Sequence, residues 1–166
     1  MDLLRTLRFA TRLKSKPERG QSLVETAIVF PVLLLLLSGL LDLGRLYYVY
    51  VGLQDATGEA ALFLAVSPEC ETSADGSSCT DPNNALFRAQ NAGGTTGVID
   101  FSTITTNITY TDDEPTPNGI RDIGDTVTVT MDYPFEFLTP IMPKISGANP
   151  ITLRAISSQV IVQNPD

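Results

Sequence analysis

One uninterrupted apolar run dominates the pattern of hydrophobic and polar residues along this chain. Between Glu25 and Asp42 there are 16 residues without a charge, Thr26 to Leu41. A helix needs ~20 such residues to cross a hydrocarbon core of ~30 Å, so the run by itself is short. The apolar pattern continues beyond Asp42, and Arg45 is spaced to pair with Asp42 on the helix surface. We therefore predict a transmembrane helix that extends past the membrane.

This helix is predicted to run from about Ser22 to Val66, some 45 residues and about 68 Å at 1.5 Å a residue. Past the membrane, apolar residues recur on one stripe, which is typical of a helix half-buried against a domain. They are Leu46, Val49, Leu53, Ala56, Ala60 and Leu64. The outer half of the helix should thus belong to the core of a folded domain.

A short helix and three strands are predicted downstream. The helix is expected from Asn83 to Ala92, where NNALFRAQNA has helical spacing. The segment from Phe101 to Thr111 is rich in Ile and Thr, and TVTVTMDYPFEF alternates over residues 126–137. The last strand is expected over Ile151 to Val162. Loops of moderate length join the strands, so an antiparallel sheet with one face on the helix is the economical arrangement.

Two irregularities are expected in this sheet. Pro134 has no amide donor and should end or flank the regular pairing. The apolar alternation of the last strand changes face near Ala155, which predicts a bulge there. The predicted fold class is α+β, with a long N-terminal helix, transmembrane and then amphipathic, packed on a small antiparallel sheet of about three strands.

Charge is distributed unevenly along the 166 residues. Six of the 11 basic residues precede the apolar run: Arg5, Arg8, Arg12, Lys14, Lys16 and Arg19. From Leu46 onward, four basic residues stand against 15 acidic ones. Basic residues beside a membrane span mark its cytoplasmic side, so the N-terminus should lie inside and the acidic domain outside. An acidic exterior also argues against nucleic acid as a partner, because binding phosphates needs a basic patch.

The two cysteines, Cys70 and Cys79, lie in a polar loop on the predicted outer side, where disulfides persist. A bridge between them is predicted, and the alternative is two unpaired thiols. A zinc site is not expected, because the chain has no histidine and no second cysteine pair.

No enzyme motif, catalytic residue or cofactor is predicted. The chain lacks histidine, a Gly-x-Ser-x-Gly sequence and a phosphate-binding loop. One acidic loop has oxygen ligands of the kind that calcium prefers. Its residues are Asp112, Asp113, Glu114, Asn118, Asp122 and Asp125. Their spacing is not that of an EF-hand, which favours a solvated acidic hairpin over a calcium site.

Several segments together resemble the TadE-like pseudopilins, minor pilins of the tight-adherence (Tad) pilus systems. The resemblance rests on RGQSLVE from Arg19 to Glu25, on Pro31 followed by leucines, and on DLGR before the tyrosines. Leu53-Gln54-Asp55-Ala56 adds to it. It implies a pilin-like α+β fold and other pilins or pseudopilins as partners through the N-terminal helix. Membrane lipid and a prepilin-type peptidase are the further partners it implies.

The resemblance also implies roles for Gly20, Gln21 and Glu25. The peptidase would cut after Gly20 and create an amine at Gln21, leaving Glu25 as the fifth residue of the mature chain. Glu25 would then pair with the amine of an adjacent subunit, which lowers the cost of a carboxylate among apolar groups. The alternative is that Glu25 only stabilises the positive end of its own helix or lies among lipid headgroups.

The expected organisation is a basic cytoplasmic leader at 1–20, the transmembrane half of the helix at 21–50 and an extracytoplasmic α+β domain at 51–166. The expected location is the bacterial cytoplasmic membrane, crossed once, with a possible place in a surface filament. Two function classes are open: a structural pseudopilin of a Tad-type pilus, or a singly anchored module for ligand binding or adhesion. A major filament subunit is a variant of the first class. Glu25 and the glycine before it favour the pseudopilin, since a tether needs neither.

Overall fold

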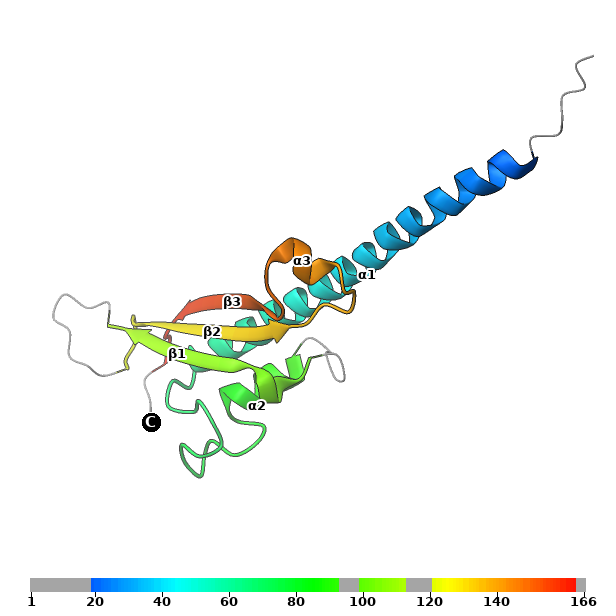
Figure 1. The fold of residues 1–166 in the computed structure, drawn as a ribbon. Coiled ribbons are helices and arrows are strands. Elements are labelled where there is room, and N and C mark those ends of the chain that lie inside the picture. The colour runs from blue at the N-terminus through cyan, green and yellow to red at the C-terminus, as the bar shows by residue number, and fades with distance from the viewer. Residues whose placement is uncertain (1–18, 93–98, 113–120, 164–166) are drawn as a thin grey trace, which may run out of the picture. The chain divides into compact units, whose positions relative to one another are not determined.

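The computed structural model describes residues 19–92, 99–112 and 121–163 and has an α+β fold, as the sequence predicted (Figure 1). Its helices are α1 (Arg19–Leu64), α2 (Ala85–Asn91), the 3-10 turn η2 (Phe101–Thr103) and α3 (Met142–Ser146). Its strands are β1 (Thr105–Thr111), β2 (Thr126–Phe135) and β3 (Ile151–Val160). The chain divides into two compact units, Met1–Ser38 and Gly39–Asp166.

The part of α1 in the first unit is apolar and has no packed face. Every described side chain from residue 22 to residue 37 is exposed. Two hydroxyls bond within this part of the helix: Thr26 donates to the carbonyl of Ser22, and Ser38, next along, to that of Leu35, both at 2.9 Å. These internal bonds leave the surface apolar on every side.

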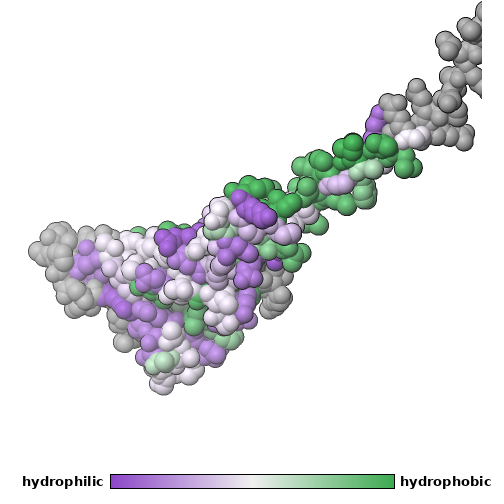
Figure 2. Space-filling view, viewed as in Figure 1, coloured by the Kyte–Doolittle hydropathy of each residue, from purple (hydrophilic) through white to green (hydrophobic). Residues whose placement is uncertain are grey.

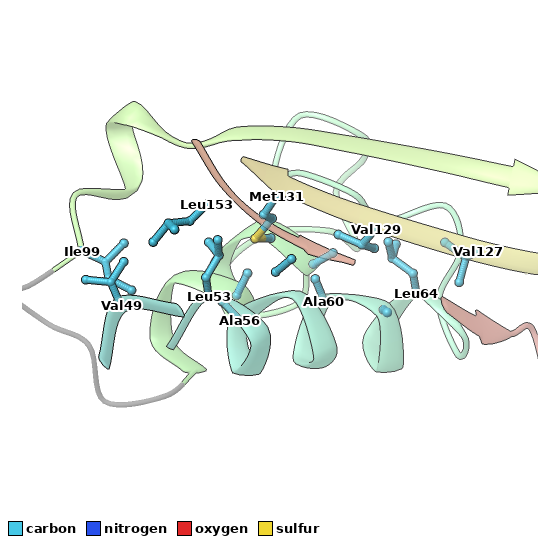
Figure 3. Packing of buried hydrophobic residues seen from close by; sticks show 14 of the residues in the cluster. Val49, Leu53, Ala56, Ala60, Leu64, Ile99, Val127, Val129, Met131 and Leu153 are labelled. Carbon is cyan, nitrogen blue, oxygen red and sulfur yellow. The ribbon is translucent and has the colours of Figure 1, made fainter. Parts of the chain in front are cut away.

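In the second unit, α1 packs on one face of a three-stranded antiparallel sheet with the order β1-β2-β3. Figure 3 shows the helix side chains pointing at those of the strands. The buried residues of α1 are Val49, Leu53, Ala56, Ala60, Ala61 and Leu64. Those of β2 and β3 are Val127, Val129, Met131, Phe135, Leu153 and Ala155. The core therefore contains all of the predicted helix stripe except Leu46, which is partly buried against it.

The predicted bulge near Ala155 is wrong. The β2–β3 register runs without interruption from Thr126 opposite Val160 to Phe135 opposite Ile151. Ala155 faces the core, whereas Ile156 lies on the open face of the sheet, exposed to 55%. The apolar residues change face near Ala155 because some of them are exposed on an edge strand, which folded proteins tolerate. The register of the strand does not change.

Pro134 flanks the β1–β2 pairing, as predicted, but it does not end the β2–β3 pairing. Strand β2 continues through it to Phe135, and Pro134 has Thr152 as its partner. Strand β1 pairs only as far as Asp132. At Pro134 the central strand therefore has a neighbour on one side only, the position in which a sheet accepts proline.

A disulfide joins Cys70 and Cys79, the pair that the sequence indicated, in the loop between α1 and α2. Buried Asn84 organises the same loop. Its side chain accepts the amide of Phe87 at 2.8 Å, which caps α2, and donates to the carbonyl of Cys79 at 3.1 Å. One asparagine thus satisfies the helix terminus and fixes the cysteine loop against it.

Candidate functional site

The helix α1 carries the candidate site, and its N-terminal part has the surface of a membrane anchor. Among the residues that the structure describes, it is the one helix long and apolar enough to cross a membrane. It fits a single-pass anchor. Side chains exposed all round over residues 22–37 need cover from lipid or from other helices, because water is a poor solvent for them.

Gly20, Gln21 and Glu25 lie within the first two turns of this helix. Gly20 is exposed, and a Cβ built on it would meet no atom within 4 Å. Glu25 is exposed as well, one helical turn beyond Gln21. Positions four apart lie on the same face of a helix, so the backbone at Gln21 and the carboxylate are on one side of α1. Their processing and assembly roles remain predictions.

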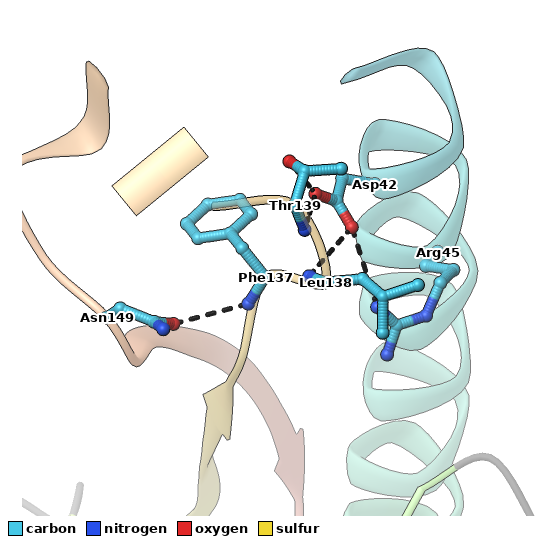
Figure 4. A network of polar contacts seen from close by, with 6 residues as sticks. All are labelled: Asp42, Arg45, Phe137, Leu138, Thr139 and Asn149. Carbon is cyan, nitrogen blue, oxygen red and sulfur yellow. Dashed lines mark hydrogen bonds and ion pairs between the residues drawn. The ribbon is translucent and has the colours of Figure 1, made fainter. Parts of the chain in front are cut away.

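A second feature of α1, the surroundings of Asp42, was missed in the sequence. The Asp42 side chain is only 1% exposed. Its carboxylate accepts the backbone N–H groups of Leu138 and Thr139, both at 3.0 Å, and the Thr139 hydroxyl at 2.6 Å (Figure 4). Arg45 Nη1 lies 3.6 Å from the Asp42 carboxylate, so the predicted ion pair is present. It was expected on the helix surface, whereas the Asp42 side chain is buried.

This arrangement stabilises a charge that burial alone would penalise. Hydrogen bonds to a charged group contribute about 1.5–3 kcal/mol each, so three of them and a cation offset the loss of hydration. Arg45 is itself held in place, because its guanidinium lies 5.4 Å from the centre of the Phe135 ring. We call Asp42, Leu138 and Thr139 the Asp42 clamp. It attaches the β2–β3 connection to α1.

The helical period is the signal that could have identified Asp42 as a buried residue. Asp42 lies four, seven and eleven residues before Leu46, Val49 and Leu53, so it falls on the stripe that packs against the sheet. The sequence already offered Arg45 as a nearby partner for the Asp42 carboxylate, so no distant partner was sought. The distant partner is 97 residues away in the sequence, in a loop without periodicity.

A polar cluster ties the disulfide loop to the sheet at Pro68. The Tyr110 hydroxyl and Arg121 Nη1 both donate to the Pro68 carbonyl, at 2.8 and 3.0 Å. Arg121 also pairs with Glu71 at 2.9 Å and stacks on the Tyr110 ring at 3.8 Å. Burial, and then the negative charge of Glu71, raises the pKa of Tyr110. The phenol therefore stays protonated and remains a hydrogen-bond donor.

The acidic loop is described in part. Asp113, Glu114 and Asn118 lie outside the described residues, whereas Asp112, Asp122 and Asp125 lie within them. Asp125 is buried and accepts the Asp122 amide at 3.2 Å, which shapes the turn into β2. Within the ranges 19–92, 99–112 and 121–163, no three His, Cys, Asp or Glu residues are grouped as a metal site.

A shallow groove of about 680 Å³ lies between α1 and α2. Its polar lining includes Asp55, Glu59, Arg88 and Asn91. Glu59 pairs with Arg88 at 3.6 Å, and Arg88 also lies over the Phe63 ring at 4.7 Å. These contacts hold α2 to α1.

Comparison with known families matches residues 20–62 to the family described as TadE-like protein. This confirms the resemblance over that segment, which runs from Gly20 almost to the end of α1. The match includes Gly20, Glu25 and Asp42. No curated protein and no solved structure matches the chain.

Proposed function

We propose that the protein is a structural pseudopilin, a minor pilin that takes part in assembling a Tad-type pilus. The TadE-like match over residues 20–62 supports a role related to that pilus. The observation that carries the proposal is the all-round exposure of the apolar helix surface from residue 22 to residue 37. Such a surface can exchange lipid for other apolar helices, which is the step that takes a subunit from a membrane into a helical bundle.

Processing is the first step of this function. The basic leader stays in the cytoplasm, and a prepilin-type peptidase cuts after Gly20. Gly20 is exposed, and a Cβ built on it would meet no atom within 4 Å, so no packed side chain covers the bond that the peptidase would cut.

Assembly is the second step. The new amine at Gln21 of one subunit pairs with Glu25 of its neighbour, so that a carboxylate in apolar surroundings gains a cation. The position of Glu25 supports this role, since it is exposed at the start of an apolar helix surface. Other pilins are therefore partners along α1, and membrane lipid is the partner before assembly.

The Asp42 clamp serves the same function mechanically. It fixes the β2–β3 connection to α1 by bonds to two successive backbone amides. Because the clamp and the core residues Val49 to Leu64 both attach the sheet to this helix, the folded domain includes the part of α1 from Asp42 to Leu64. We infer that the protein works through packing and has no catalytic role.

Photo-crosslinking in cells that assemble pili tests the proposal. A photoreactive residue at Val29, whose side chain is 62% exposed, should form adducts with other pilin subunits. The same residue at exposed Ser73, in the disulfide loop, is the matched control and should give few or none. Equal adducts at both positions, or adducts with lipid alone at Val29, would argue for a tethered module instead.

A further inference from the structure

The connection between β2 and β3 has an exposed apolar surface. Leu138 is 78% exposed, Ile145 is 73% exposed, and Ile141 adds to the same surface. Figure 2 shows hydrophobic surface gathered over α3, the short helix in this connection. Large apolar side chains grouped at this exposure mark a surface that contacts something other than water.

The structure fixes this connection to one short stretch of α1. The Asp42 clamp holds it through the backbone of Leu138 and Thr139. One turn earlier on the same helix, a Cβ at Gly39 would lie 4.0 Å from Met142 Sδ, so α3 packs there as well. The exposed surface is therefore beside residues 39–42 of α1.

Residues 39–42 are also where the charge-free run of α1 ends. The 16 residues from Thr26 to Leu41 give about 24 Å of helix, less than the ~30 Å of a hydrocarbon core. Asp42 does not end the apolar surface, because its carboxylate is 1% exposed and fully bonded to the β2–β3 connection. Leu43, just beyond it, is again an exposed apolar residue.

We propose that the β2–β3 connection contacts phospholipid in the outer interface of the membrane, through Leu138, Ile141 and Ile145. The outer end of the span is then built jointly by α1 and this connection, which makes up for the short apolar run. This inference rests on the membrane anchor of the proposed function and adds a second lipid-binding element to it.

The charges around the surface favour a lipid partner. Lys144 precedes Ile145 and is exposed, so its ammonium can reach a headgroup phosphate while its stem follows the apolar residues. Tyr47 on α1 is exposed just beyond the clamp, in the place where interfacial tyrosines gather. Three apolar side chains also give far less than the ~800 Å² that each partner buries in a stable protein interface.

Depth-dependent fluorescence quenching tests the inference. The full-length protein is placed in vesicles of phosphatidylethanolamine and phosphatidylglycerol, and an environment-sensitive dye is attached to Leu138→Cys or Ile145→Cys without reductant. Both side chains are exposed, and the Leu138 bond to Asp42 comes from its backbone, so the substitutions keep the clamp. Leu35→Cys, in the apolar run, and Ser73→Cys, in the disulfide loop, are the membrane and water controls.

We expect a nitroxide near the headgroup end of the acyl chains to quench the dyes at positions 138 and 145 at least half as strongly as the dye at 35, with little effect at 73. Quenching at 35 together with unquenched dyes at 138 and 145 would overturn the inference and leave the anchor intact. If these two dyes are shielded from both lipid and water, a second protein covers the surface, which also overturns it. An unquenched dye at 35 would refute the anchor itself and the inference with it.

Discussion

The carboxylate of Asp42 accepts both the backbone N–H and the hydroxyl of Thr139, at 3.0 and 2.6 Å, across 97 residues of sequence. An acid that follows an apolar run thereby becomes a buried attachment point for the far end of the sheet. These bonds should therefore contribute to the free energy of unfolding of the domain, which a substitution of Asp42 can test.

Replacing Asp42 by Asn should destabilise the domain by about 3 kcal/mol, because three donors lose a charged acceptor and an amide NH₂ faces them. The measurement is the free energy of unfolding of the full-length protein in detergent. Asp55→Asn is the matched control: it changes an exposed acid on the same helix and should shift stability by less than about 0.5 kcal/mol. Equal stability of the two variants would mean that the clamp contributes nothing.

Alkylation should leave Cys70 and Cys79 unmodified until a reductant is added, because the disulfide holds both sulfur atoms. After reduction, intact mass should rise by two alkyl groups, and the domain should lose about 2–3 kcal/mol, the typical effect of closing a short loop. Cys70→Ser should leave one thiol, Cys79, which is 1% exposed in the folded chain and should react without reductant once the protein is denatured. Modification of both wild-type cysteines without reductant would show that the bridge is absent in the cell.

The bidentate contact between Arg154 and Asp132 on the open sheet face predicts a pH effect. Arg154 Nε and Nη2 donate at 2.7 and 2.8 Å, and these bonds hold the pKa of Asp132 below its ordinary value of 3.8. A lowered folded-state pKa means that the contribution is complete above the ordinary pKa and is lost as pH falls through the folded value.

Titration of the Asp132 carboxyl carbon by NMR should therefore have its midpoint below 3.8. In Arg154→Gln the midpoint should rise toward the ordinary value, since the donors and the positive charge are gone. Arg88→Gln, which removes a cation elsewhere in the domain, should leave it unchanged. An identical midpoint in wild type and Arg154→Gln would contradict the contact.

Glu25→Ala should be processed normally yet fail to co-purify with other pilins. The substitution removes the carboxylate that we propose pairs with a neighbour's amine, while alanine keeps the helix. Thr26→Ala is the neighbouring control, because the Thr26 hydroxyl donates to the Ser22 carbonyl of its own helix. Pull-down from cells that assemble pili, read by quantitative mass spectrometry, should lose pilins for the first variant only. Normal recovery with Glu25→Ala would remove Glu25 from assembly.

Much of the fold could be predicted because its elements have strong periods. The stripe from Val49 to Leu64 repeats at helical spacing, and Val127, Val129 and Met131 alternate, so α1, β2 and their shared core followed directly. The irregularities of the sheet followed less directly. Ile156 and Val160 are apolar but exposed, so hydropathy placed a bulge that the structure does not have. The missing amide of Pro134 does not end β2, which continues to Phe135, but Pro134 does flank the β1–β2 pairing, which stops at Asp132.

The candidate site divides in the same way. Gly20, Gln21 and Glu25 lie within six successive residues, so a local motif was enough to select them. The Asp42 clamp depends on Thr139, in a loop whose backbone amides supply most of the bonds. Every residue except proline has such an amide, so no residue type marks the loop as a partner.

Intact mass of the protein extracted from membranes of pilus-assembling cells tests the central claim most directly. A chain cut after Gly20 should be about 2 kDa lighter than the full sequence, because the leader is 20 of the 166 residues. Gly20→Trp, at a position where a side chain meets no neighbour, should keep the full mass. A wild-type chain that still begins at Met1 under these conditions would contradict processing and the pairing of Glu25 with an amine at Gln21.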